Sequence, residues 1–260
     1  MVLVEPSAME HERHDQQLRR IARPAREAEQ GAGTSQRVRG ARRVLLASRS
    51  PRRRELLAQH DIAHEAIHPG VDDSGFVPGN VSPEQWVTAL AYLKARAGAD
   101  VLSQKLEAGR AGVDGPGSGI GDLAQDAVRA QDYFVLGADT TCVLEGRSLG
   151  TPVDADEARA MLEAFRGKAH EVITGVAILD LATGKRHLFA DRATVTLGDL
   201  SGPEIDEYVA SKDWQGKAGA YNLSERLKAG WPLSFEGEPS TIMGLPIKLV
   251  VAKLRSLGVD

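Results

Sequence analysis

The sequence has one cysteine, no long apolar run and no strong excess of either charge. Its single cysteine, Cys142, cannot form an internal disulfide, which excludes a disulfide-stapled fold and favours a reducing compartment. No segment approaches the ~18 consecutive apolar residues of a membrane-spanning helix, so we expect no membrane association. The net charge of −4 disfavours nucleic acid as a partner. What remains is ordinary globular composition, and 260 residues suit one large domain or two small lobes sharing a core.

The first 43 residues differ in composition from the remainder. They contain nine Arg and no Lys against six Asp+Glu, and they lack the apolar stretch of a secretory signal. Three interpretations are open: a disordered extension, a weak polyanion-binding arm and an overlong translation start. A segment so poor in apolar residues buries too little surface to fold alone. We therefore expect residues 1–43 to be a disordered extension, residues 44–260 to form the functional domain, and the protein to be cytoplasmic.

Short apolar runs alternate with helical patterns along the rest of the chain. Val44–Ala47 predicts a buried strand, and Ser50 and Pro51 can cap and begin a helix that runs through Leu57. Strands and helices alternate first and adjacent strands follow, so the sequence favours a mixed α/β sheet over a purely parallel one. Further strands are predicted at Ala63–His68, Tyr133–Ala138, Cys142–Leu144, Val172–Leu181 and His187–Leu197. Further helices are predicted from Ser82 (with Val87, Leu90, Ala91 and Leu93 buried) and at Asp156–Phe165, Pro203–Val209 and Pro246–Leu257.

Residues 101–131 have a composition unlike that of their neighbours. Six of these 31 residues are glycine, and the stretch Gly115–Gly119 cannot hold regular structure. We expect a flexible surface insertion between two elements. A lid over a ligand is the second interpretation.

The turn after the first predicted strand has the chemistry of an anion site. Ser48 and Ser50 supply hydroxyls, the helix start supplies N–H groups, and Arg52, Arg53 and Arg54 supply guanidiniums. A guanidinium binds phosphate oxygens with two parallel hydrogen bonds. The alternative is a capped helix with solvated arginines.

Carboxylates gather at two other positions. Asp139 is expected just past the end of a buried strand, where open α/β sheets bind ligands. There it can hold a divalent cation or orient a water molecule, or it can simply complete a turn. Asp72 and Asp73 form a second acidic pair. Lys94 projects from the helix that follows, and a lysine snorkelling from a helix face is its ordinary explanation.

Several common sites are not indicated. His170 has no second His or Cys at metal-ligand spacing, so we expect no zinc site. Cys142 lies in an apolar stretch and is expected to be a small core residue. Neither the P-loop pattern nor a glycine fingerprint after a strand is present, which removes the usual support for a kinase or a dinucleotide-binding protein.

Six segments in a fixed order carry a resemblance to a known family. They read LLASRSPRRRELL at 45–57, VLGADT at 135–140, HEVITGVA at 170–177, YVAS at 208–211, KAGAY at 217–221 and GLP at 244–246. Together they resemble the Maf family of nucleoside triphosphate pyrophosphatases. The resemblance covers about residues 44–257, apart from the 101–131 insertion.

The resemblance implies a fold, a reaction and a set of site residues. The fold would be a mixed twisted α/β sheet in two lobes around a nucleotide cleft, akin to inosine-triphosphate pyrophosphatases. The reaction would be hydrolysis of a nucleoside triphosphate to a monophosphate and pyrophosphate, with Mg²⁺ or Mn²⁺ as cofactor and a homodimer as the assembly. Such a reaction needs charge neutralisation and an oriented water. The implied roles are proton acceptance by Asp139, metal binding by Asp73 and Asp139, phosphate binding by Ser48, Arg52, Arg53, Lys94 and Lys217, and base choice by Arg52, Thr140 and Ser224.

Two positions depart from the family pattern. Gly150-Thr151-Pro152 stands where the family has G-K-P with a phosphate-binding lysine. Asn222-Leu223-Ser224-Glu225 stands where pyrimidine-type members have G-I-Q-G, so Ser224 replaces the glutamine tied to thymine or uracil recognition. Arg52, in contrast, resembles the pyrimidine type, because members acting on methylated guanine nucleotides have tryptophan there.

We therefore expect a nucleoside triphosphate pyrophosphatase that sanitises the nucleotide pool, acting on dTTP/UTP-like or modified nucleotides. The alternative is a nucleotide-binding regulator of cell division with little turnover. Thr151 and Ser224 are the residues that favour this alternative.

Overall fold

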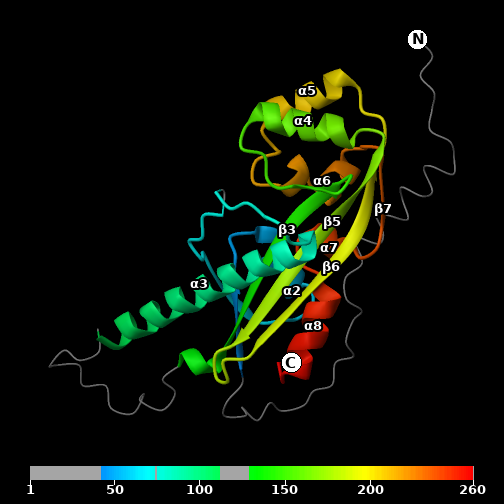
Figure 1. Cartoon of the computed structure of the whole chain (residues 1–260). Helices are drawn as coiled ribbons and strands as arrows, with labels where there is room; N and C mark the ends of the chain where they lie inside the picture. Colours follow the sequence, from blue (N-terminus) through cyan, green and yellow to red (C-terminus); the bar gives the residue numbers. More distant parts are fainter. Residues whose placement is uncertain (1–41, 74, 112–128, 260) are drawn as a thin grey trace.

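A mixed β-sheet forms the centre of the protein (Figure 1). The computed structural model describes residues 42–73, 75–111 and 129–259. Within them the strand order is β2-β1-β3-β5-β6-β7, with β4 pairing with part of β3. β1 runs parallel to β2 and β3, and the other pairs are antiparallel, which confirms the expected mixed sheet. The strands are β1 (Arg43–Ala47), β2 (His64–Ile67), β3 (Tyr133–Leu144), β4 (Arg147–Leu149), β5 (Lys168–Asp180), β6 (Arg186–Leu197) and β7 (Leu233–Glu236).

Helices cover the two faces of this sheet differently. One face carries the long helix α3, and the other carries two separate groups of helices with α7 between them (Figure 1). The first group is α2 (Pro51–Ala58) and α8 (Ile247–Ser256), and the second is α4 (Ala155–Phe165), α5 (Gly202–Ser211) and α6 (Leu223–Lys228). The remaining helical segments are α3 (Pro83–Ala111), α7 (Pro239–Ile242), η1 (Ala130–Asp132) and η2 (Ala218–Ala220). Among the described residues, none of these helices is both long enough and apolar enough to cross a bilayer.

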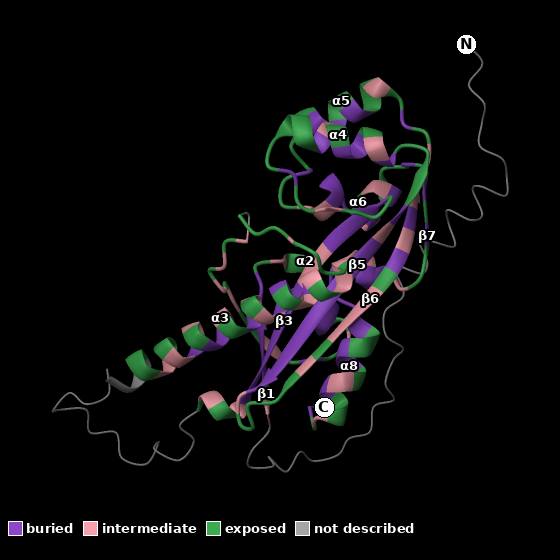
Figure 2. Ribbon diagram, viewed as in Figure 1, coloured by how far each residue is buried: buried purple, intermediate pink, exposed green. Residues whose placement is uncertain are grey.

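The two helix groups form two lobes with separate cores, joined by the long strands β3, β5 and β6. Phe165 and Tyr208 pack in the lobe of α4 and α5, whereas Leu57 and Phe134 pack in the lobe of α2 and α8. Of these strands β3 and β5 are largely buried, whereas β6 is mostly half-buried or exposed (Figure 2). Cys142 belongs to the first of these cores, and burial raises the pKa of its thiol to about 12, so its prediction as a core residue is confirmed.

The predicted break in the third strand is wrong. Tyr133–Ala138 and Cys142–Leu144 are parts of one continuous strand, β3, because Asp139 and Thr140 pair with consecutive residues of β5. A local pattern could not reveal this, since the pairing partners lie more than 30 residues away in the sequence.

The predicted insertion at residues 101–131 is wrong in its first third. Residues 101–111 complete α3, and Leu102 is buried against the sheet. Residues 112–128, like residues 1–41 of the predicted extension, lie outside the described residues. The described chain begins two residues before Val44, with Arg42 ion-paired to Asp180.

The buried face of α3 also differs from the prediction. Val87, Leu90 and Ala91 are buried as expected, but Leu93 is 41% exposed. The row that contacts the sheet follows the i, i+4 spacing of Val87, Ala91 and Ala95, which turns Leu93 away from it.

Gly137 allows α3 to lie directly against β3. A Cβ atom on Gly137 would be 2.2 Å from the carbonyl oxygen of Ala91 and 2.7 Å from the backbone nitrogen of Ala95. The helix backbone therefore occupies the space that any side chain would need. This close approach also brings Lys94, which directly precedes Ala95 in the helix, beside Asp139 of the strand.

Gly137→Ala should destabilise the protein by about 1–3 kcal/mol, because the new methyl group would clash with backbone atoms of α3, which cannot change rotamer as a side chain can. Urea unfolding measures the effect. Gly202→Ala is the matched control, since nothing lies within 4 Å of the corresponding Cβ position. Equal stability of the two variants would contradict the close packing of α3 on β3.

Candidate functional site

The candidate site lies where the sheet is open on one side of β3. On that side β3 pairs with β1 through Leu136 and with β4 from Cys142 onward. Within the described strands nothing pairs with residues 137–141 on this side, whereas β5 pairs along the whole opposite side. Asp139 therefore lies in the middle of β3, not past its end. The strand that ends beside it is β1.

Side chains in this gap reach both faces of the sheet. Because side chains alternate along a strand, Asp139 faces α3 and contacts Lys94, while Thr140 faces α2 and contacts Arg53. Polar side chains from both faces of the sheet therefore lie beside the gap.

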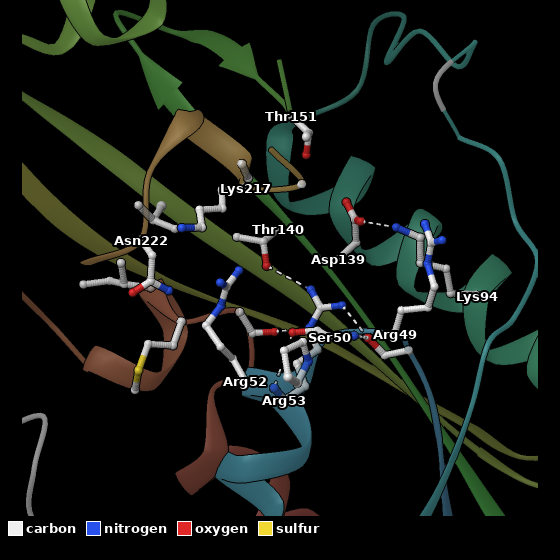
Figure 3. A pocket seen from close by; sticks show the side chains of 18 of the residues that line it. Arg49, Ser50, Arg52, Arg53, Lys94, Asp139, Thr140, Thr151, Lys217 and Asn222 are labelled. Atoms are coloured by element: carbon white, nitrogen blue, oxygen red, sulfur yellow. Dashed lines mark hydrogen bonds and ion pairs between the residues drawn. The ribbon is translucent and has the colours of Figure 1, made fainter. Parts of the chain in front are cut away.

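A cleft of about 660 Å³ opens at the gap, between the two lobes (Figure 3). This volume lies in the usual range for small-ligand sites. The cleft brings together nearly all of the predicted site residues: Ser48, Arg52, Arg53, Asp73, Lys94, Asp139, Thr140 and Lys217, with Thr151 at its edge. Ser224 is not among the lining residues. Its hydroxyl donates to Oδ1 of Asn222 over 2.7 Å, and Asn222 does line the cleft.

Lys94 joins two carboxylates at one end of the cleft. Its Nζ lies 2.5 Å from Oδ1 of Asp139 and 2.7 Å from Oδ2 of Asp73. The Lys94 and Asp139 side chains are 18% and 13% exposed, so this network is poorly screened by solvent. One ammonium thus occupies a position that two carboxylates face.

These two carboxylates fit a divalent cation. Asp73 and Asp139 converge on one cationic position, and Mg²⁺ is commonly bound by one or two carboxylates together with substrate phosphates. No cluster of three or more His, Cys, Asp or Glu side chains that could hold a metal occurs in the described part of the chain. The donor set is therefore one that substrate oxygens would complete.

Arg53 organises the loop between β1 and α2. Its guanidinium donates to the carbonyl oxygen of Gly244 (2.7 Å), to the Ser48 hydroxyl (3.3 Å) and to the Thr140 hydroxyl (3.3 Å). Burial lowers the pKa of Arg53, and the charge of Asp139 opposes this effect. Arginine stays protonated in proteins, so Arg53 places a fixed positive charge behind the loop.

The start of α2 has the capping that the sequence predicts. The Ser50 hydroxyl accepts the Arg53 N–H over 3.4 Å, and Pro51 occupies the first helical turn. The Ser48 hydroxyl accepts the Ser50 N–H over 3.1 Å. These contacts fix the loop that carries the arginines along the wall of the cleft.

Arg52 is held differently from Arg53. Its guanidinium makes no hydrogen bond within the described residues, and its Nε is buried without a partner. The nearest carboxylate oxygen is Oε1 of Glu225, 3.9 Å from Nη1. A buried N–H without an acceptor is costly, so this arginine fits an anionic ligand.

The opposite wall supplies Lys217 and Thr151. Lys217 is 12% exposed and forms an ion pair with Glu225. The carbonyl oxygen of Gly150 accepts the Gly219 N–H over 2.9 Å, which ties the Thr151 loop to η2. Thr151 is exposed at the cleft and brings no charge to it.

Two cleft residues were not assigned a role by the sequence analysis. Arg49 is exposed at the cleft, and Asn222 is a buried residue that also lines it (Figure 3). The signal for Arg49 was its place in the Ser48–Arg54 turn. Asn222 directly follows the KAGAY segment, but only the fold shows that it reaches the cleft.

Tyr221 is supported from behind the cleft by His170. Its hydroxyl lies 2.9 Å from Nε2 of His170, whose ring stacks on Phe165 with centroids 4.0 Å apart. Burial lowers the pKa of His170 to about 4 and raises the pKa of Tyr221 well above its ordinary value. Both groups are therefore uncharged at neutral pH, and a neutral hydrogen bond fixes this part of the wall.

The depressed pKa of His170 predicts a loss of stability in acid. Between its ordinary value of 6.5 and about 4 the unfolded chain binds the proton more readily, so stability falls as pH drops through this range. The loss approaches about 3 kcal/mol from this residue. His170→Gln does not titrate and should lose less stability between pH 7 and pH 4, as measured by urea unfolding. The same pH dependence in both proteins would contradict the buried neutral histidine.

Comparison with known proteins gives consistent matches. A family model described as Maf-like protein matches residues 43–257, which run from β1 to the end of α8. A dTTP/UTP pyrophosphatase of Pelotomaculum thermopropionicum is 35% identical over 215 residues, covering 83% of this chain and 96% of the relative. Relatives with the same name from Bacillus cereus (strain B4264) and Bacillus thuringiensis subsp. konkukian are 35% and 36% identical over 219 residues, covering 84% of this chain and 97% of each relative.

Proposed function

The chain belongs to the Maf family, and we propose that it hydrolyses nucleoside triphosphates to nucleoside monophosphates and pyrophosphate. One observation carries the proposal. The gap beside β3 brings the carboxylates of Asp73 and Asp139 into the same cleft as the guanidinium of Arg52, whose Nε is buried without a partner. A triphosphate needs both, because its reacting phosphate requires a base and its remaining charge requires cations.

Asp139 is the proposed general base. It is the less exposed of the two carboxylates and lies in the rigid centre of β3. In this role it takes a proton from the water that attacks phosphorus. Asp73 and Asp139 would hold a divalent cation, Mg²⁺ or Mn²⁺, which supplies neutralisation of phosphate charge when bound.

Cations from both walls are proposed to hold the phosphates. The Ser48 hydroxyl approaches from the β1–α2 loop, Arg52 from the first turn of α2, and Lys217 from the residue before η2. Lys94 can donate to a phosphate oxygen when it releases a carboxylate. Arg53 already has three protein partners, so it supplies positive potential and holds Thr140 and Ser48 in place.

The base is proposed to be thymine or uracil, as the names of the relatives indicate. Thr140 and Ser224 are predicted specificity residues, but both hydroxyls are engaged within the protein. Asn222 offers a freer group: its Oδ1 accepts two hydrogen bonds, from Ser224 and from the Glu225 N–H, which leaves its NH₂ for a pyrimidine carbonyl. Ser224 is thus proposed to act by orienting Asn222.

Location and assembly follow the resemblance. We propose a cytoplasmic enzyme that works as a homodimer in nucleotide-pool sanitation, without nucleic acid as a partner. The single buried cysteine agrees with a reducing compartment.

Product analysis tests the proposed reaction. The protein should release monophosphate and pyrophosphate in equal amounts from dTTP and UTP with Mg²⁺ or Mn²⁺, and chelation should stop turnover. A panel of canonical and modified nucleotides gives the preference. Nucleotide binding without any product would contradict the proposal and favour the alternative, a nucleotide-binding regulator of cell division.

Asp139→Asn should lower kcat by about 10²–10⁴-fold, because it removes the group that accepts the proton while preserving its size. Steady-state pyrophosphate release measures the loss, and thermal unfolding checks the fold. Asp206→Asn is the control, since Asp206 pairs with Arg159 on the exposed side of α5. Turnover near the wild-type rate in Asp139→Asn would exclude Asp139 as the base.

Thr151→Lys should raise kcat/KM for dTTP by about tenfold or more, because a charge-assisted hydrogen bond to phosphate contributes about 1.5–3 kcal/mol when partly desolvated. Arg147, the nearest cation in sequence, and Lys228 are not among the residues that line the cleft. Thr151→Ala is measured alongside. Equal values for wild type and both variants would show that residue 151 does not reach the phosphates.

A further inference from the structure

Glu225 places a carboxylate between two cations that come from different lobes. Its Oε2 forms an ion pair with Nζ of Lys217, and its Oε1 lies 3.9 Å from Nη1 of Arg52. Arg52 belongs to α2 in one lobe, whereas Lys217 and Glu225 belong to the other. One side chain thus neutralises part of the positive charge on both walls of the cleft.

The two cations have few other partners. Glu225 is the only carboxylate that pairs with either Lys217 or Arg52 among the described residues. Arg52 makes no hydrogen bond there, and its Nε is buried without an acceptor. Arg52 is therefore held loosely, and an anion that reaches its Nε gains a hydrogen bond that Glu225 does not supply.

The fold fixes the position of Glu225. Its N–H donates to Oδ1 of Asn222 over 3.0 Å in the first turn of α6, and α6 is anchored by the buried side chains of Leu223 and Leu227. The carboxylate itself stays 43% exposed, so it can leave the two cations without unpacking the helix. Glu225 lies in the Asn222–Glu225 stretch, which departs from the family pattern. Recognition of the nucleotide base, the role expected of this stretch, does not explain Glu225.

We infer that Glu225 is an internal counter-anion of the phosphate-binding cleft. Its carboxylate holds Lys217 and faces Arg52 in the free protein, and a phosphate group of the substrate displaces it. The inference rests on the proposed function, because it assigns Lys217 and Arg52 to phosphate groups.

Competition by Glu225 imposes the same cost on every phosphate ligand that displaces it. A triphosphate or pyrophosphate gains several contacts with Arg52, Lys217 and the β1–α2 loop, and these outweigh the lost ion pair. A monophosphate offers one phosphate group and replaces Glu225 with little gain. Glu225 thus lowers the affinity of both by the same factor, and for the weakly held monophosphate product this favours release.

Binding of inorganic pyrophosphate and of dTMP, measured by calorimetry, tests the inference without any need for turnover. Glu225→Gln removes the charge and keeps the size, and should bind both anions up to about fivefold more tightly than wild type, since an exposed charge pair contributes up to about this much. In kinetics, the KM for dTTP and the inhibition constant of dTMP should fall in the same variant. Glu145→Gln is the matched control: Glu145 forms an ion pair with Lys168 at 2.8 Å outside the cleft, and the same change in net charge there should leave these constants unchanged.

Pyrophosphate affinity that is unchanged or weaker in Glu225→Gln would overturn the inference. A changed preference between bases at unchanged pyrophosphate affinity would also overturn it and would place the carboxylate at the base. The proposed function fails separately, when wild type binds pyrophosphate but releases none from any triphosphate. If neither protein binds pyrophosphate, the assignment of Lys217 and Arg52 to phosphates is wrong and the inference falls with it.

Discussion

Among the described strands, residues 137–141 of β3 have a partner on one side only, and the cleft depends on this gap. The pairing of β1 with β3 ends at Leu136, before Asp139, and β4 pairs with β3 only from Cys142 onward. The loop that leaves β1 therefore turns over the open stretch of β3 and carries its serines and arginines there. β3 pairs with β5 through the open stretch, so its backbone is held in the sheet from that side although the other side is unpaired.

Three cations of the cleft already face a carboxylate of the protein. Lys94 lies between Asp73 and Asp139, and Glu225 lies near Lys217 and Arg52. Lys94 and Asp139 are little exposed, so separating that pair without a ligand is costly. A phosphate-bearing ligand can exchange these internal pairs for its own, so binding is an exchange of partners rather than the filling of an empty charged site. Arg53 stands outside this exchange, because its protein contacts hold the loop in place.

Local features of the fold were predictable from the sequence, and features that need distant partners were not. The buried strand at Val44–Ala47 and the cap at Ser50 depend on neighbouring residues, and both are confirmed. The continuity of β3 through Asp139 depends on β5, and the helical state of residues 101–111 depends on contact between Leu102 and the sheet. The segments that carry the family resemblance identified most of the cleft. The ion pairs of Lys94 join α3 to β3 and to the segment after β2, and the contact of Glu225 with Arg52 joins the two lobes, so no spacing in the sequence encodes them.

Phosphates and metal are proposed to bind together at the open stretch of β3. A crystal structure with Mn²⁺ and a dTTP analogue that cannot be cleaved between its α and β phosphates tests it most directly. The account predicts an anomalous manganese peak within ligand distance of Asp73 and Asp139, with the phosphates running toward Arg52 and Ser48. A triphosphate bound outside this cleft, or manganese held away from both carboxylates, would contradict it.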